Sequence, residues 1–134
     1  MPTYTYQQKM EFLAKLYCPA RKASFQTGLS WRTLMAQAML ETGSGEKVLL
    51  GTNNIFNIKA NRSWTGAKSQ HLVPEFVIEN GRKVKKMVND WFRNYDSYED
   101  SLIDRVQFIL NDKNYKIMKN PEILGNFEKE VQAL

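Results

Sequence analysis

The spacing of apolar and polar residues at the start of the chain predicts two successive helices. Thr5 and Gln8 form a capping box, and the apolar residues that follow recur every three or four positions. Pro19 disfavours helix at the residue before it, but it can occupy the first position of a new helix. Gly28 is a typical C-cap residue, so the second helix is expected to end near Gln26.

A third helix is predicted from Ser30 to Glu41, and apolar residues occupy almost every side of it. Ser30 is a favourable N-cap, and two glycines shortly after Glu41 break the helix. Leu34, Ala38 and Glu41 fall on one stripe, so Glu41 is expected to share the buried face. Burial and the negative end of the helix dipole both favour a protonated carboxyl group, which suits a general acid. The alternative is a Glu that extends into solvent at a helix end.

The pattern changes to alternation between residues 70 and 78, which predicts a strand. Asn80-Gly81 is a strong signal for a hairpin turn, because both residues tolerate positive φ. Residues 83–92 are expected to return as the second strand, and Pro74 indicates an edge strand. The prediction is a small hairpin lobe of two or three strands inserted into a helical protein.

Helical patterns resume after the hairpin. Ser97 with Asp100 is a capping-box-like start for a helix, and a short helical turn is expected near residues 115–118. Asn120-Pro121 is expected to open a last helix. The predicted order is four or five helices, a hairpin, and two or three helices, in one domain over residues 1–134. This order indicates a mostly helical α+β fold.

The predicted helix and the segment after it carry a set of motif residues: Ala36, Gln37, Glu41, Thr42, Gly43, Gly45, Asn54, Phe56, Ile58 and Lys59. This set resembles the signature of glycoside hydrolase family 73, the peptidoglycan-cleaving β-N-acetylglucosaminidases of flagellar rod-assembly proteins and several autolysins. The family often has Trp in place of Ser44 and Gly in place of Asn57, and Asn is a mild change where φ is positive. The resemblance covers roughly residues 12–134 and implies a lysozyme-like fold. Family members usually continue with a Gly-Tyr-Ala-Thr-Asp-Pro-like segment after the position of Leu134.

Glycoside hydrolysis usually requires two carboxyl groups that flank the scissile bond. Glu41 is expected to donate the proton, and the resemblance of Pro-Glu-Phe to the family's Thr-Glu-Tyr makes Glu75 the expected second group. Glu79, beside the turn, is the alternative, and assistance by the sugar's acetamido group is another. A hairpin held only at its ends should be mobile, so Glu75 is expected to approach Glu41 only on lobe closure. That arrangement favours a water-activating base and an inverting outcome.

Five further residues are expected to bind or shape the substrate groove. Asn54 and Phe56 should shape the cleft beside Glu41. Trp64 either stacks on a sugar at the rim or plugs the edge of the core. Tyr95 and Tyr98 belong to a Tyr-Asp-Ser-Tyr run that resembles the family, and they either line the groove or serve as core tyrosines.

Composition limits the other classes of function. The single cysteine, Cys18, excludes an internal disulfide, and no Cys/His cluster has metal-ligand spacing, so no cofactor or metal is expected. No apolar run is long enough to span a membrane, so membrane insertion is not expected. The net charge of +5 is consistent with an anionic partner. The basic residues near 82–86 raise a nucleic-acid-binding alternative, although charge runs on hairpins are usually solvated faces.

The resemblance to family 73 implies a bacterial peptidoglycan hydrolase. It should cut β-1,4 bonds between N-acetylglucosamine and N-acetylmuramic acid in the periplasm or cell wall, with glycan strands as its partner. The alternative is a catalytically inactive module that binds cell-wall glycan. The first residues lack the features of a signal peptide, so export is expected by a non-classical route or within a larger polypeptide. Further expected partners are that parent polypeptide, a secretion apparatus or an inhibitor protein.

Overall fold

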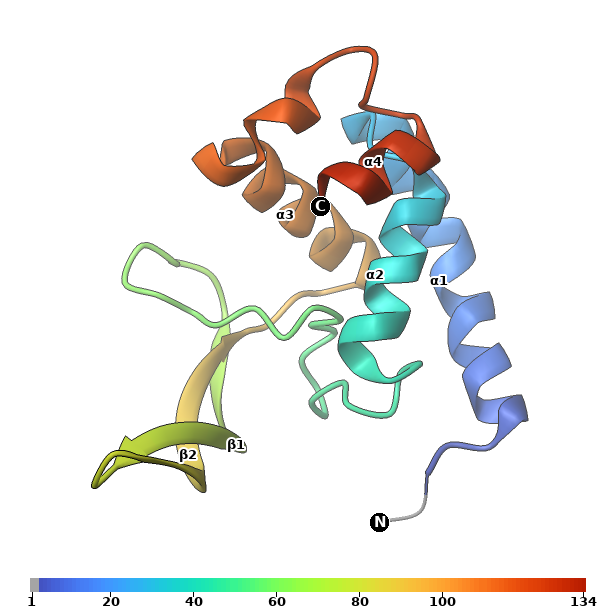
Figure 1. Ribbon diagram of the computed structural model, residues 1–134. Coiled ribbons are helices and arrows are strands. Elements are labelled where there is room, and N and C mark those ends of the chain that lie inside the picture. The colour runs from blue at the N-terminus through green and yellow to red at the C-terminus, as the bar shows by residue number, and fades with distance from the viewer. Residues whose placement is uncertain (1–2) are drawn as a thin grey trace.

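The computed structural model describes residues 3–134 and consists of a helical body from which a β-hairpin projects (Figure 1). Two helices precede the hairpin and three helical segments follow it: α1 (Tyr6–Thr27), α2 (Trp31–Thr42), β1 (Lys68–Glu79), β2 (Arg82–Arg93), α3 (Tyr98–Asn111), the 3₁₀ helix η1 (Lys113–Lys119) and α4 (Phe127–Ala133). The mostly helical α+β fold, with its hairpin between helices, is confirmed. Four or five helices were expected before the hairpin, whereas the structure has two.

Helix α1 continues through Pro19, so the predicted break at this position is wrong. The buried residues Phe12, Leu16, Ala20 and Ala23 form one stripe that runs past the proline without interruption. Burial of this stripe against the body offsets a helix-interior proline, which costs about 3 kcal/mol. The predicted ends are confirmed, because Thr5 forms the capping box and Gly28 is the left-handed C-cap.

The core lies where α1, α2 and α3 meet, and Figure 1 shows these three helices next to one another. Its completely buried members come from these three helices, from η1 and from the connections: Leu16, Ala20, Ala23, Leu29, Leu34, Ala38, Ile55, Leu102, Val106, Ile109 and Met118. In residues 3–134, no helix has the combination of length and apolarity that a bilayer crossing needs.

The two strands pair antiparallel around the predicted Asn80-Gly81 turn, where φ is 51° and 77°. Glu79 pairs with Arg82, so the loop has two residues, as this turn type requires. Both strands are longer than predicted, and both are edge strands of a two-stranded sheet, as Pro74 indicated. The third strand that was considered is reduced to a single bridge between Lys59 and Phe92.

The last helix begins later than predicted. Asn120 caps a turn, with its side-chain oxygen 3.0 Å from the Glu122 amide nitrogen, and Gly125 then has φ 92°. A helix cannot pass through this conformation, so α4 starts at Phe127 with Asn126 as its N-cap. The helix opening predicted at Asn120-Pro121 is therefore wrong.

Candidate active site

The turn that follows α2 is held in one conformation by its own sequence. Gly43, Ser44 and Gly45 all have positive φ, between 58° and 98°. The Thr42 hydroxyl donates to the Ala38 carbonyl at 2.6 Å and accepts the Gly45 amide at 2.8 Å. A Cβ at Gly45 would lie 2.5 Å from the ring of Phe12, so only glycine fits. Glu41 therefore stands at the end of a helix whose exit is fixed.

Glu41 is exposed, and the prediction that it shares the buried face of α2 is wrong. The buried face is formed by Thr33, Leu34, Met35, Ala38 and Thr42. Glu41 shares a stripe with Leu34 and Ala38, which are buried, but it lies in the last turn of α2 and extends into solvent there, as the alternative for this residue had it. Its carboxyl group makes no hydrogen bond or ion pair within residues 3–134. Helix α2 carries apolar residues on every side, but the body of the protein covers only one side of it.

The side chain of Asn54 hydrogen-bonds to backbone groups of two separate segments. It is completely buried, and its amide nitrogen donates to the carbonyls of Ile58 and Arg93, both at 2.9 Å. Its amide oxygen accepts the Ile58 N–H at 3.0 Å. These bonds join the segment after the turn to the end of β2. Phe56 is also buried, beneath the guanidinium of Arg105, and Asn57 has the positive φ expected of it.

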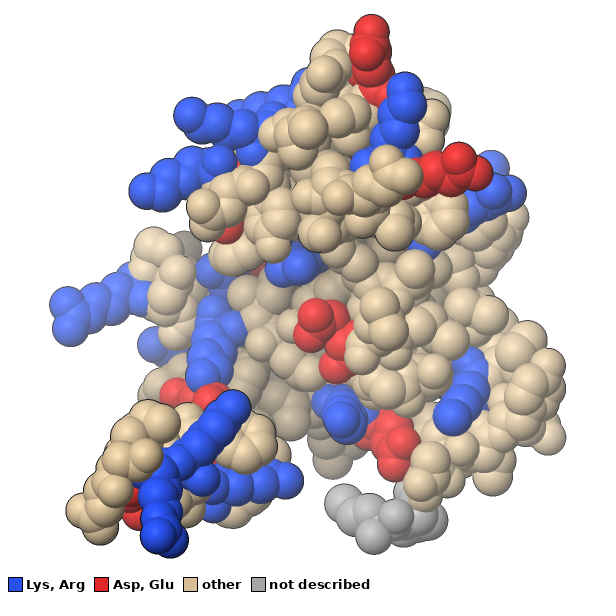
Figure 2. Space-filling view, in the orientation of Figure 1, with Lys and Arg blue, Asp and Glu red and all other residues tan. Residues whose placement is uncertain are grey.

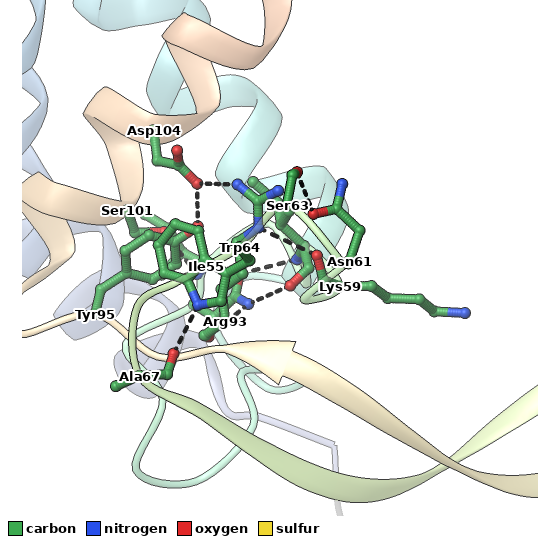
Figure 3. A network of polar contacts seen from close by, with 12 residues as sticks. Ile55, Lys59, Asn61, Ser63, Trp64, Ala67, Arg93, Tyr95, Ser101 and Asp104 are labelled. Carbon is green, nitrogen blue, oxygen red and sulfur yellow. Dashed lines mark hydrogen bonds and ion pairs between the residues drawn. The ribbon is translucent and has the colours of Figure 1, made fainter.

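A polar network connects the end of β2 to α3 and to the Trp64 loop (Figure 3). Arg93 forms an ion pair with Asp104 at 2.8 Å and donates to the Lys59 carbonyl at 3.1 Å. The Tyr95 hydroxyl donates to the same Asp104 carboxylate. Burial and this carboxylate raise the pKa of Tyr95. Asp104 thus organises the network, although nothing in the sequence pattern of α3 distinguishes it from a surface acid.

Trp64 is packed into this network and also lines a pocket. Its ring lies over the Arg93 guanidinium, at 4.6 Å, and edge-on to Tyr95, at 5.7 Å. Its indole N–H donates to the Ala67 carbonyl at 2.9 Å, and a Cβ at Gly66 would collide with the ring. The pocket, of about 370 Å³, is lined by Trp64, Gly66, Ala67, Asn94, Tyr95, Asp96, Asp100, Ile103, Asp104 and Gln107. Trp64 therefore has features of both alternatives, a packed ring and a pocket wall.

Tyr98 lies elsewhere. Its ring packs against Phe12, with centroids 6.1 Å apart, and it lines a second hollow together with Gly45 and Asn53. Burial, and to a lesser extent Tyr4, raise the pKa of Tyr98. The two tyrosines therefore do not line the same pocket.

Glu75 is half-buried on the hairpin face that it shares with Asp90. The Lys59 ammonium lies 2.7 Å from Glu75 and 3.0 Å from Asp90, and these carboxylates raise the pKa of Lys59. Glu79 pairs with Lys86. No hydrogen bond or ion pair within residues 3–134 joins Glu41 to Glu75. Sequence reasoning missed Asp90, but the register set by the turn could have assigned it to the face of Glu75.

No group of three or more His, Cys, Asp or Glu side chains in the described part of the chain is arranged to hold a metal ion. The chemistry available at the site is that of carboxyl, hydroxyl and ammonium groups on α2, the hairpin and the connections between them.

Comparisons with known proteins agree with this fold. The family model described as mannosyl-glycoprotein endo-beta-N-acetylglucosaminidase matches residues 18–133. The peptidoglycan hydrolase FlgJ of Pseudomonas aeruginosa is 35% identical over 131 residues, which cover 91% of this chain and 31% of the relative. FlgJ of Salmonella typhimurium is 38% identical over 110 residues, or 78% of this chain and 34% of the relative. The chain thus spans about a third of the length of these curated relatives.

Solved structures give the same result. The glycoside hydrolase domain of Salmonella typhimurium FlgJ is 30% identical, with a TM-score of 0.75, and the match covers 94% of this chain and 74% of that one. The catalytic domain of the autolysin Auto from Listeria monocytogenes, at 21% identity, has a TM-score of 0.75 over 99% of this chain and 76% of that one, and it shares the fold. The chain belongs to the glucosaminidase family of glycoside hydrolases.

Proposed function

We propose that this chain hydrolyses the β-1,4 glycosidic bonds of peptidoglycan strands, with Glu41 as the proton donor. The observation that carries the proposal is the placement of Glu41, whose carboxyl group has no intramolecular partner in residues 3–134 and is exposed in the last turn of α2, just before the turn that Thr42 and Gly45 fix. A general acid has to be free to reach the leaving oxygen of the bond, and Glu41 is the acidic residue of the motif that resembles the family signature. The printed activities of the related hydrolases support the same substrate.

The surroundings of Glu41 suit a sugar chain. Leu40, the residue before Glu41, exposes an apolar side chain at the same end of α2, and a bound glycan strand would cover this end of the helix. In the free protein Glu41 stands in water, so the water-excluded environment that favours proton donation would come from the bound glycan. The Glu41 carboxyl would protonate the leaving oxygen as the glycosidic bond breaks, and water would attack the anomeric carbon.

Glu75 is the proposed second group. Its contact with Lys59 positions the Glu75 side chain on the hairpin face, where it could activate a water molecule, and Asp90 shares the same lysine. Movement of the hairpin toward Glu41 would complete the pair, with an inverting outcome. Assistance by the substrate's acetamido group is the alternative route, and it needs no second protein carboxylate.

The groove is proposed to run between the end of α2 and the hairpin. Trp64 and Tyr95 would contact sugars at the pocket that they line, and Tyr98 would do so at the separate hollow beside Asn53. Asn54 and Phe56, both buried, would shape the groove from beneath. Action on glycan strands would take place in the periplasm or cell wall. The further expected partners, a parent polypeptide, a secretion apparatus or an inhibitor, stay predictions.

The test is lysis of purified cell wall by Glu41→Gln. Gln keeps the size of the side chain but cannot donate the proton, and loss of general-acid help typically costs about 10²–10⁴ in rate. Glu46→Gln is the matched control, because it removes a carboxyl group from the turn directly after α2 and should keep the rate. A Glu41→Gln variant with more than about a tenth of the wild-type rate would remove Glu41 from the mechanism.

Mass spectrometry of the released muropeptides identifies the bond. An N-acetylglucosamine reducing end supports a glucosaminidase, and an N-acetylmuramic acid end would make the chain a muramidase instead. Binding of cell wall without any released product would support the inactive glycan-binding module over the enzyme.

A further inference from the structure

The hairpin has two faces of different chemistry. The register assigns Lys68, Gln70, Leu72, Pro74, Phe76 and Ile78 of β1 to one face, together with Lys83, Lys85, Met87, Asn89 and Trp91 of β2. We call these eleven residues the outer face, because all of them are exposed. The opposite face carries the four valines of the hairpin and is half-covered.

The outer face exposes large apolar side chains that nothing in the described structure covers. Leu72, Phe76, Ile78, Met87 and Trp91 are each between 45% and 72% exposed. Clustered exposure of this kind on a soluble protein marks an interaction surface.

The charges of the hairpin are segregated between the two faces. The outer face has three lysines and no acidic residue, whereas Glu75, Glu79 and Asp90 all lie on the opposite face. Those three carboxylates are balanced there by Lys59, Arg82 and Lys86, of which Lys59 and Lys86 form ion pairs. Figure 2 shows Lys and Arg side chains over the lobe at the lower left, which is the hairpin of Figure 1. The unneutralised positive charge therefore coincides with the exposed apolar residues.

Lysines and aromatic rings alternate closely on the outer face. The Lys83 ammonium lies 4.7 Å from the ring centre of Phe76, and that of Lys68 lies 5.0 Å from the ring centre of Trp91. Apolar and aromatic side chains with lysines beside them are typical of segments that lie at a membrane interface, where the rings enter the headgroup region and the ammonium groups meet anionic lipids.

We propose that the outer face of the hairpin docks peripherally on an anionic lipid surface. This proposal does not depend on the proposed glycan hydrolysis, because none of the eleven residues belongs to the proposed catalytic or sugar-binding groups. A lipid surface accounts for both features at once, the apolar cluster and the three lysines beside it. A soluble anionic polymer would use the lysines but would leave the apolar side chains in water. Phe76 and Trp91 are also too far apart to stack neighbouring bases, because their pairs lie six positions apart along the sheet.

Vesicle sedimentation with the full chain tests the proposal. We expect binding to vesicles of phosphatidylcholine mixed with phosphatidylglycerol, no binding to phosphatidylcholine alone, and weakening by salt. Replacement of Lys83 and Lys85 by Gln should weaken binding roughly 30-fold. Arg82→Gln with Lys86→Gln is the matched control, because it removes the same charge from the opposite face of the same strand and should bind as the wild type does.

Phe76→Ser with Ile78→Ser should abolish sedimentation with the vesicles, while cell-wall lysis stays at the wild-type rate. Trp91 fluorescence should shift to the blue with anionic vesicles, and subtraction of the Trp91→Phe signal isolates it. Three outcomes would overturn the proposal: no binding to anionic vesicles, equal binding to neutral vesicles, or binding to an oligonucleotide that is as tight as binding to vesicles and is unaffected by the Phe76 and Ile78 changes.

Discussion

At the scale of single residues, the Tyr95 hydroxyl makes the stability of the protein depend on alkaline pH. Burial and the Asp104 carboxylate raise its pKa above the ordinary value near 10. The fold therefore favours the protonated phenol, and this stabilisation is complete below pH ~10 and is lost as the pH rises toward the folded-state pKa. Urea unfolding at a series of pH values should show wild-type stability falling above pH ~10 more steeply than that of Tyr95→Phe. Parallel curves for the two proteins would contradict the assignment.

Thr42 is the residue that we expect to determine the geometry at Glu41. Thr42→Val keeps the shape but removes the acceptor for the buried Gly45 amide, and an unsatisfied buried donor costs about 1–3 kcal/mol. Thr42→Ser keeps the hydroxyl and serves as the control. Thermal unfolding measures the loss of stability, and cell-wall lysis should fall further than unfolding alone explains. A Val variant with wild-type stability would mean that the turn does not need this bond.

The sequence predicted the backbone conformation of residues for which the residue type and its immediate neighbours are sufficient. Positive φ at Asn57 and the C-cap at Gly28 follow from the residue type alone. The exposure of Glu41 could not be predicted, because it depends on which side of α2 its neighbours cover, and Ala36 and Leu40 are apolar yet exposed. The contacts of Asp104 could not be predicted either, because its partners Arg93 and Tyr95 come from another segment of the chain.

At the scale of elements, α4 holds the beginning of α2. The side chain of Glu130 is completely buried, and it accepts the Ser30 amide, the Thr33 hydroxyl and the Gly125 amide. Glu130→Ala would leave these donors without a partner, so we expect a loss of about 3–5 kcal/mol in the free energy of unfolding. Glu128→Gln is the control, because it changes an exposed carboxyl group on the same helix and should cost less than about 0.5 kcal/mol. Equal urea midpoints for the two variants would show that α4 does not anchor α2.

Element boundaries were predictable where caps and turns define them. The capping box at Thr5 and the turn at Asn80-Gly81 contain their whole signal within four residues. Pro19 and the start of α4 were predicted wrongly, because packing decided them: a continuous buried stripe carries α1 past its proline, and Glu130 joins α4 to a partner 100 residues earlier in the chain.

At the scale of the whole molecule, the attachment of the hairpin to the body is the feature that governs the proposed site. The Asn54 bonds and the Arg93–Asp104 pair fix its base, whereas Lys59 is an exposed contact farther along it. Hydrogen exchange should therefore be faster in the hairpin than in α1, and slowest in the core helices. Lys59→Met should speed exchange in the hairpin and change the melting temperature little, because exposed ion pairs contribute about 0–1 kcal/mol. If hydrogen exchange in the hairpin is unchanged in this variant, the Lys59 ion pairs do not restrain the hairpin.

The choice of the second carboxylate is the last prediction, and it depends on the same hairpin. If Glu75 activates water after the lobe closes, Glu75→Gln should reduce turnover strongly, but less than Glu41→Gln, because water or a neighbouring group can partly replace it. Glu79→Gln breaks an ion pair of similar kind on the same face and should leave turnover close to wild type. NMR of the first-formed product should show inversion at the anomeric carbon. Full lysis by Glu75→Gln together with loss in Glu79→Gln would transfer the role to Glu79. Full lysis by both variants, with retention at the anomeric carbon, would indicate that the substrate's acetamido group works with Glu41 alone.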